Sequence, residues 1–253
     1  MMTTPGQANT LIVQPRRALY IFGGAGIVVV ILSFLSQYIR LFPDSYNIHY
    51  PIQADLIRDF ILEFNFSGKS DIAIYYSVLI LNVAACLLFI IAYLKNIDRD
   101  PYRFQWTGMA WIVLFFAIDS LAQILKKIQE FFRDKGWIGG GSEYVWVTGL
   151  VFLLAVLFFR FWLHLDNKYR FLFLVSAALY FAGVLGMEIT SFYNSKEFIY
   201  SLFLTIEQGL QYGGVTLLIY SLLLYITSFF PQFFVSVGGL RDGGRNTQQN
   251  VTK

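Results

Sequence analysis

The sequence predicts an all-α integral membrane protein, a bundle of about six transmembrane helices with a short amphipathic helix in the first outer loop. The chain has 253 residues, of which 57% are hydrophobic and 14% are charged, whereas soluble domains contain about 25% charged residues. Its mean hydropathy is +0.57. The apolar residues lie in runs of about 20, the length of a helix that crosses a bilayer, and short charged segments separate these runs.

Six apolar runs fit the length of a spanning helix. They cover residues 18–39, 72–94, 106–125, 144–165, 171–189 and 201–230. The first run is too long for the hydrophobic part of a signal peptide, and no A-x-A cleavage site follows it, so we expect it to remain as a helix. We therefore expect a cytoplasmic tail over residues 1–17, a membrane domain over 18–230 and a Gly-rich, disordered cytoplasmic tail over 231–253.

The charged loop between the first two spans contains an amphipathic pattern. Apolar residues recur there at steps of three and four after Pro51. They are Ile52, Leu56, Ile57, Phe60, Ile61 and Phe64. This period is that of a helix with one apolar face, so we expect a short helix that lies on the membrane surface or covers the end of the bundle.

Lys and Arg residues favour one side of the predicted bundle. Eleven of the 19 lie in the termini, in the turns 95–105 and 166–170, or at the adjoining end of the fourth span: Arg16, Arg17, Lys95, Arg99, Arg103, Arg160, Lys168, Arg170, Arg241, Arg245 and Lys253. The other eight lie in the loops of the opposite side: Arg40, Arg58, Lys69, Lys126, Lys127, Arg133, Lys135 and Lys196. By the positive-inside rule, we expect a multi-pass protein of the cell membrane with both termini in the cytoplasm.

Three acids lie in or near the ends of otherwise apolar spans. A carboxylate at mid-membrane costs roughly 2.5–3.5 kcal/mol, so such groups usually face a partner or a wet cavity. In the predicted topology the three acids lie toward the outer side, and polar neighbours share their level. The resulting candidates for a ligand or ion pocket are Asp119, Glu188, Glu207, Gln123, Gln208, Gln211, Tyr75 and Tyr76. The alternative is structural, with Glu188 solvated at the interface and Asp119 satisfied across the bundle.

Other kinds of site fit the sequence poorly. His49 and His164, the two histidines, fall on opposite sides of the predicted membrane, so they cannot share a haem or a zinc ion. No lysine lies at mid-span for a retinal Schiff base, and no histidine lies near the acids for Ser/His/Asp catalysis. The three acids could hold Ca²⁺ or Mg²⁺, which prefer oxygen ligands. The sequence identifies no catalytic residue, no metal site and no cofactor.

Three stretches resemble an uncharacterised family of bacterial six-helix multi-pass membrane proteins. FFAIDSLAQILKKIQE is similar to the family's F-x-S/A-I/L-D-E and H-E motifs in the third span. ILEFNFSGKSDIAIYYSVLIL is similar to its E-x-N-(I/L)-P-T-W-Y-S entry to the second span, and EQGLQYGGVTLLIYSLLLYI to its E-E-x-L-E-M-x-G final span. The resemblance covers much of residues 60–227 and implies a six-helix topology. It implies no activity, because the family's function is not established.

The resemblance implies that the chain is a divergent member of that family. Asp119, Glu188 and Glu207 keep the family's acids. Other positions depart from the motifs: Ser120 replaces an acid, Leu125 and Lys126 replace His-Glu, and Gln208 and Gln211 replace glutamates. A metal site built from the family's residues would therefore lack its histidine and several carboxylates here.

These features favour a membrane protein without enzymatic activity that has a structural, sensing or ligand-binding role. One alternative is a transporter or channel subunit that uses the acids as an ion or proton path. A second is a membrane hydrolase with a carboxylate-bound metal. We expect membrane lipids as partners, together with either a second copy of the chain or another membrane protein. We expect no nucleic-acid partner, because the basic residues are spread over the loops.

Overall fold

The computed structural model describes residues 14–41, 71–135, 143–190 and 198–229. This part of the chain consists of helices and turns without strands, which confirms the all-α prediction. The helices are α1 (Pro15–Leu41), α3 (Asp71–Ile97), α4 (Arg103–Ala122), α5 (Ile124–Asp134), α6 (Glu143–His164), α7 (Asn167–Thr190) and α8 (Phe198–Phe229). The predicted amphipathic helix after Pro51, the tail 231–253 and most of the tail 1–17 lie outside the described residues.

Five of these helices are long and apolar enough to cross a membrane. They are α1, α3, α4, α7 and α8. The fourth predicted span corresponds to α6, in which the described apolar stretch runs from Phe152 to His164. The third predicted span differs in its bounds, because α4 begins at Arg103 and ends at Ala122, after which the separate helix α5 begins.

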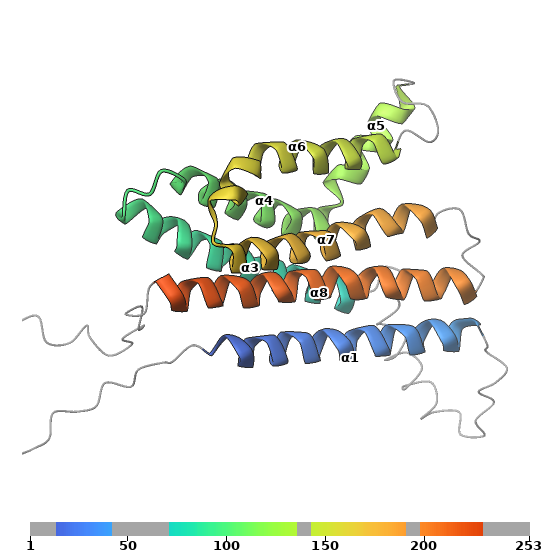
Figure 1. Cartoon of the computed structure of the whole chain (residues 1–253). Coiled ribbons are helices and arrows are strands. Elements are labelled where there is room, and N and C mark those ends of the chain that lie inside the picture. The colour runs from blue at the N-terminus through green and yellow to red at the C-terminus, as the bar shows by residue number, and fades with distance from the viewer. Residues whose placement is uncertain (1–13, 42–70, 136–142, 191–197, 230–253) are drawn as a thin grey trace, which may run out of the picture.

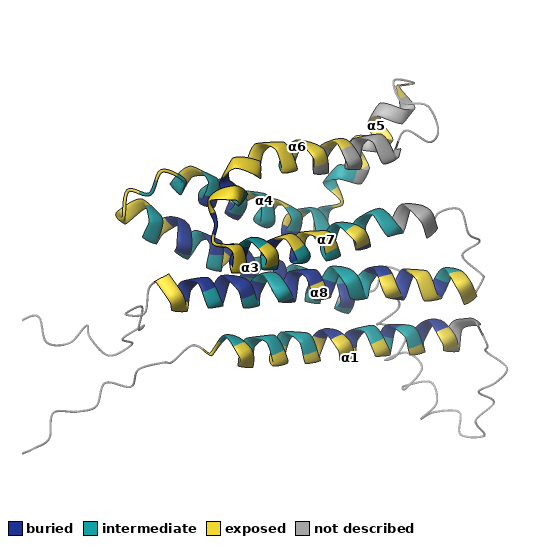
Figure 2. Ribbon diagram, in the orientation of Figure 1, coloured by how far each residue is buried: buried dark blue, intermediate teal, exposed yellow. Residues whose placement is uncertain are grey.

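Helix α8 lies at the centre of the bundle (Figure 1), with α1 along one side and α7 along the other. It also contacts α3, and α4 packs against α3. Helix α6 packs on α7 at the outside of the bundle, less extensively than α7 packs on α8. Figure 2 shows the result: the middle of α8 is buried, whereas α6 is largely exposed along its described length. The environment of α8 explains why its sequence is apolar on nearly all faces.

The two ends of the bundle differ in charge. Helix α1 begins and α8 ends at the same end, where the α3–α4 and α6–α7 turns also lie (Figure 1). We call this the basic end because its described Lys and Arg residues are Arg16, Arg17, Lys95, Arg99, Arg103, Arg160, Lys168 and Arg170, against the acids Asp98, Asp100 and Asp166. The far end is where α4 and α7 end and α8 begins.

An aromatic cluster joins four helices near the basic end. Trp106 of α4 is only 1% exposed. Its ring centroid lies 4.9 Å from that of Phe161 on α6, 5.0 Å from that of Tyr225 on α8 and 6.2 Å from that of Phe173 on α7. Offset and edge-to-face ring pairs at these distances add to the packing energy. Trp106 therefore holds the four helices together at the basic end.

The α3–α4 turn is fixed by an ion pair at the same end. Lys95 Nζ lies 3.0 Å from Asp100 Oδ2, and Asp100 Oδ1 accepts a hydrogen bond from the Tyr102 N–H at 2.8 Å. Burial acts to raise the pKa of Asp100, but the Tyr102 amide and the Lys95 ammonium outweigh it, so this pKa lies below its usual value. The Lys95 ammonium also lies 5.6 Å from the ring centroid of Tyr225, which ties the turn to α8.

Candidate functional site

Helices α7 and α8 approach each other closely through glycines. A Cβ atom at Gly214 of α8 would lie 2.7 Å from the backbone nitrogen of Tyr180 and 2.8 Å from the carbonyl oxygen of Ser176, both on α7. The Ser176 hydroxyl donates a hydrogen bond to the Gly214 carbonyl at 2.7 Å. At Gly183 of α7, a Cβ atom would lie 2.5 Å from the carbonyl oxygen of Glu207. Small residues therefore allow backbone contact here, as in many membrane helix pairs.

Glu207 of α8 is buried in this contact, with 4% of its surface exposed. A Cβ atom at Gly186 of α7 would lie 2.8 Å from Glu207 Cγ and 3.1 Å from Glu207 Oε1. One helical turn further along, Gln211 packs in the same way against Gly183, where a Cβ atom would lie 2.6 Å from its Cγ. The glycines of α7 thus leave room for the polar side chains of α8. Their three-residue spacing was the sequence signal that could have indicated this arrangement.

Asp119 lies in the last turn of α4 and connects it to α5. Its Oδ1 atom accepts the backbone N–H of Leu125 at 2.8 Å, and its carbonyl oxygen accepts the N–H of Gln123 at 2.7 Å. Gln123 adopts the left-handed conformation, with φ 51° and ψ 43°, and ends α4. The carboxylate therefore satisfies one of the free N–H groups in the first turn of α5, which is a structural role at the joint.

The Asp119→Ala substitution should loosen this joint. We expect α5 to lose its first turn and the free energy of unfolding to fall by about 1 kcal/mol, because the Leu125 N–H loses its acceptor. Hydrogen exchange of the Leu125 amide, measured in detergent, should increase, whereas Asp119→Asn should keep most of the protection because its amide oxygen can still accept. Unchanged exchange in Asp119→Ala would show that the carboxylate does not hold the joint.

The other sequence candidates are dispersed. Tyr75 is 59% exposed, and Gln123 is also exposed, whereas Gln208 is half-buried. Tyr76 of α3 donates a hydrogen bond to the Phe22 carbonyl of α1 and packs edge-on against the ring of Tyr212 on α8, with 4.9 Å between centroids. Tyr76 thus contributes to the contact of α1, α3 and α8, whereas Glu207 faces α7.

The backbone places all three acids in the half of the bundle nearest the far end. Glu188 lies in the last turns of α7, two residues after Gly186, but its side chain is outside the described part of the structure. Among the side chains that the structure describes, no group of three His, Cys, Asp or Glu could hold a metal ion. That the three acids form one outward-facing pocket or ion path stays a prediction.

A polar stripe in the α1–α8 contact was missed by the sequence reasoning. Ser33, Ser36 and Gln37 of α1 are each at most 1% exposed. Gln37 Nε2 donates to Ser33 Oγ at 3.4 Å and to Thr205 Oγ1 of α8 at 3.5 Å. The signal was present, because Ser33, Ser36 and Gln37 follow Gly26 and Val29 at steps of three and four, the period of one helix face. Interhelical hydrogen bonds of this kind stabilise helix pairs in membranes.

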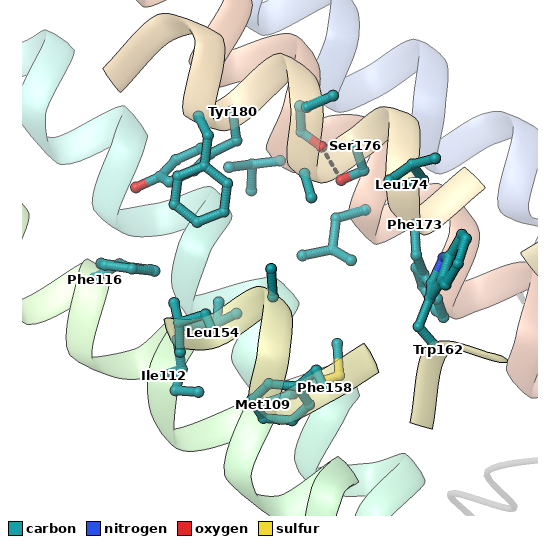
Figure 3. A pocket seen from close by; sticks show the side chains of 18 of the residues that line it. Met109, Ile112, Phe116, Leu154, Phe158, Trp162, Phe173, Leu174, Ser176 and Tyr180 are labelled. Atoms are coloured by element: carbon teal, nitrogen blue, oxygen red, sulfur yellow. Dashed lines mark hydrogen bonds between the residues drawn. The ribbon is translucent and has the colours of Figure 1, made fainter. Parts of the chain in front are cut away.

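A cavity of about 550 Å³ lies between α4, α6, α7 and the middle of α8. Figure 3 shows side chains from these helices around it. Its lining is apolar except for Ser176, Tyr180 and Trp162. The Ser176 hydroxyl is bound to the Gly214 carbonyl at 2.7 Å, and Trp162 Nε1 donates to the Arg170 carbonyl at 3.0 Å. None of the eight sequence candidates lines this cavity.

The fold and the cavity define a class of protein, a helical bundle of membrane-crossing length with an apolar cavity between its helices. The chain belongs to the family described as "Domain of unknown function (DUF8692)", which matches residues 20–226. No curated protein and no solved structure matches the chain. The chain thus belongs to an uncharacterised family, as the motifs led us to expect. The bacterial origin and the individual motifs of the resembled family stay predictions.

Proposed function

We propose that this chain is a multi-pass membrane protein that binds the acyl chain of a membrane lipid in the cavity between α4, α6 and α7. The cavity itself carries the proposal. Its volume of about 550 Å³ falls within the roughly 300–1,000 Å³ of small-molecule sites. Two polar groups in the wall, those of Ser176 and Trp162, already donate to backbone carbonyls. An apolar cavity of this kind attracts no water and accepts hydrocarbon.

The position of the cavity supports a ligand that arrives from the lipid phase. On α7, Leu174 is 51% exposed although it lines the cavity, and the neighbouring Ala177 and Ala178 are also exposed. On α6, Ala155 and Phe159 are exposed and line the opposite wall. The wall between α6 and α7 is therefore open along part of its length, as required for sideways entry of an acyl chain from a bilayer.

The charge distribution supports an orientation with the basic end in the cytoplasm. In membrane proteins, the cytoplasmic loops carry an excess of Lys and Arg. The basic end of this bundle holds eight described Lys and Arg residues against three acids. The start of α1 at Pro15 and the end of α8 at Phe229 both lie at this end. The proposed site is then a lipid-chain cavity within the membrane, with Phe161 and Phe173 of the aromatic cluster around Trp106 in its wall.

Photocrosslinking tests the proposal on the full chain in bilayer nanodiscs. The probe is a phosphatidylcholine with a diazirine in one acyl chain, and the labelled residues are identified by mass spectrometry. We expect labels on cavity-lining residues such as Leu154, Phe158 and Ala177. An Ala177→Trp substitution should fill the cavity and reduce this labelling at least fivefold, because the bulky ring takes the volume of the chain.

Two controls make this test decisive. Ala25→Trp places the same ring on the exposed surface of α1, so the labelling of the cavity should not change. Ala155→Phe fills the cavity from α6 and should repeat the effect of Ala177→Trp through a different helix. Labels distributed evenly over all exposed helix faces, with no change in the filled variants, would contradict a lipid-chain site.

A further inference from the structure

One arginine lies beside the end of the cavity. Leu165 and Trp162 line the cavity where α6 ends, and Arg170, in the first turn of α7, lies beside both. Its Nη2 atom donates to the carbonyls of Leu163 and Leu165, the latter at 3.1 Å. The guanidinium carbon lies 5.4 Å from the centroid of the Trp162 ring. A positive charge therefore borders the apolar cavity at the basic end of the bundle.

Arg170 keeps hydrogen-bonding capacity beyond these contacts. A guanidinium carries five N–H donors, and the two carbonyls engage only those of Nη2. The buried Nε–H has no acceptor among the described residues. No carboxylate in the described part of the chain forms an ion pair with Arg170. In that part, its charge thus faces the carbonyls at the end of α6 rather than a carboxylate.

The same turn carries further positive charge. Arg160 on α6 and Lys168 on α7 are both exposed at the basic end, and Asp166 is the acid in the turn between the helices. The Lys168 ammonium lies 5.9 Å from the ring centroid of Tyr169. Tryptophan and tyrosine beside basic residues are typical of the depth at which lipid headgroups lie. The α6–α7 turn, at the end of the cavity marked by Leu165, therefore combines net positive charge with interfacial aromatic residues.

From these observations we infer that the cavity selects a phospholipid with an anionic headgroup, whose acyl chain fills the cavity and whose phosphate group lies at Arg170, beside the positively charged α6–α7 turn. This inference rests on the proposed lipid-chain function and adds the chemical class of the lipid. Arginine is suited to phosphate because its planar donors match the geometry of the oxygens. Basic residues between transmembrane helices on the cytoplasmic side are a known means of holding anionic headgroups.

A competition experiment tests the headgroup preference. The full chain, in nanodiscs of phosphatidylcholine that contain the diazirine probe, receives increasing amounts of phosphatidylglycerol with the same acyl chains. We expect phosphatidylglycerol to halve the labelling of the cavity at a concentration about tenfold lower than added phosphatidylcholine, since basic residues near the headgroup attract the net negative charge that phosphatidylglycerol carries and phosphatidylcholine does not. The preference should decrease at high salt, because exposed charges are screened.

Two double variants separate the α6–α7 turn from a general attraction of charge. Arg160→Gln with Lys168→Gln removes two exposed charges beside this turn and should reduce the tenfold preference to about twofold. Arg16→Gln with Arg17→Gln removes two exposed charges from α1 at the same end of the bundle and should leave the preference unchanged. Arg170→Gln should also abolish the preference. Because it loosens the turn, its helix content is checked by circular dichroism, and the double variant of Arg160 and Lys168 provides the test if that content falls.

Each outcome decides between the two proposals. Cavity labelling with equal competition by both lipids would overturn the headgroup inference and leave the lipid-chain function intact. An equal loss of preference in both double variants would also overturn it, because the attraction would then come from the whole basic end. Absence of specific labelling in the cavity with any lipid would remove the lipid-chain function and, with it, this inference.

Discussion

Replacing Trp106 by alanine is expected to lower the free energy of unfolding by about 3–5 kcal/mol, the scale measured for buried tryptophan and phenylalanine truncations. The side chain is 1% exposed, and its ring contacts those of Phe161, Phe173 and Tyr225 on three other helices. Lipid is as apolar as the core, so helix association in a bilayer depends on close packing rather than on removal from water. A void at this position removes the contacts that hold four helices together.

The measurement is reversible unfolding in mixed micelles by increasing amounts of sodium dodecyl sulfate, followed by circular dichroism. Trp111→Ala provides the matched control, because Trp111 lies on the same helix but is 59% exposed. Its ring packs against that of Phe89, with 5.3 Å between centroids, so we expect a loss of about 1 kcal/mol. Equal losses for the two variants would show that the cluster around Trp106 does not hold the bundle together.

Replacing Gly214 by alanine is expected to lower the free energy of unfolding by about 1–3 kcal/mol, the usual cost of an extra methyl group in a packed core. The new Cβ atom would meet backbone atoms of Tyr180 and Ser176 at 2.7 and 2.8 Å. Backbone atoms cannot move aside as a flexible side chain can, so α7 must shift away from α8. This shift would also stretch the hydrogen bond from Ser176 to the Gly214 carbonyl.

Gly213 offers a control at the adjacent position. It is exposed, and a Cβ atom there would have no neighbour within 4 Å. Gly213→Ala should therefore be neutral or stabilise the protein by up to about 1 kcal/mol, because alanine favours the helix over glycine. Opposite signs for the two substitutions in the same unfolding assay would support close packing of α7 on α8. A destabilisation of similar size in both would contradict it.

The sequence was sufficient to predict the helical class, because runs of about 20 apolar residues have few other solutions in a bilayer. It was less informative about where helices end. The third span was predicted to continue to residue 125, since Gln123 to Leu125 keeps a mostly apolar run. In the structure α4 ends at Ala122, because Asp119 accepts the Leu125 N–H and Gln123 takes the left-handed conformation. Composition alone does not encode such a local hydrogen bond.

The cavity could not be predicted for a different reason. In a membrane protein, residues that face lipid and residues that face an apolar cavity have the same composition. Phe158 lines the cavity and Phe152, on the same helix, is 71% exposed, yet nothing in the sequence separates them. Polar residues are more informative, because they cannot face lipid without cost. The burial of Glu207 agrees with that rule, although the glycines that accommodate it are found only by placing α7 against α8.

The central place of α8 has a consequence for how the protein is made. The earliest described helix in the chain, α1, finds its main partner in α8, the latest one. While the ribosome synthesises the intervening residues, the Ser33, Ser36 and Gln37 side chains of α1 have no α8 to cover them. Assembly of the bundle must therefore be completed after the last helix has been synthesised. A chain that stops before Phe198 leaves this polar stripe without its cover, and in a bilayer such uncovered polar groups are costly.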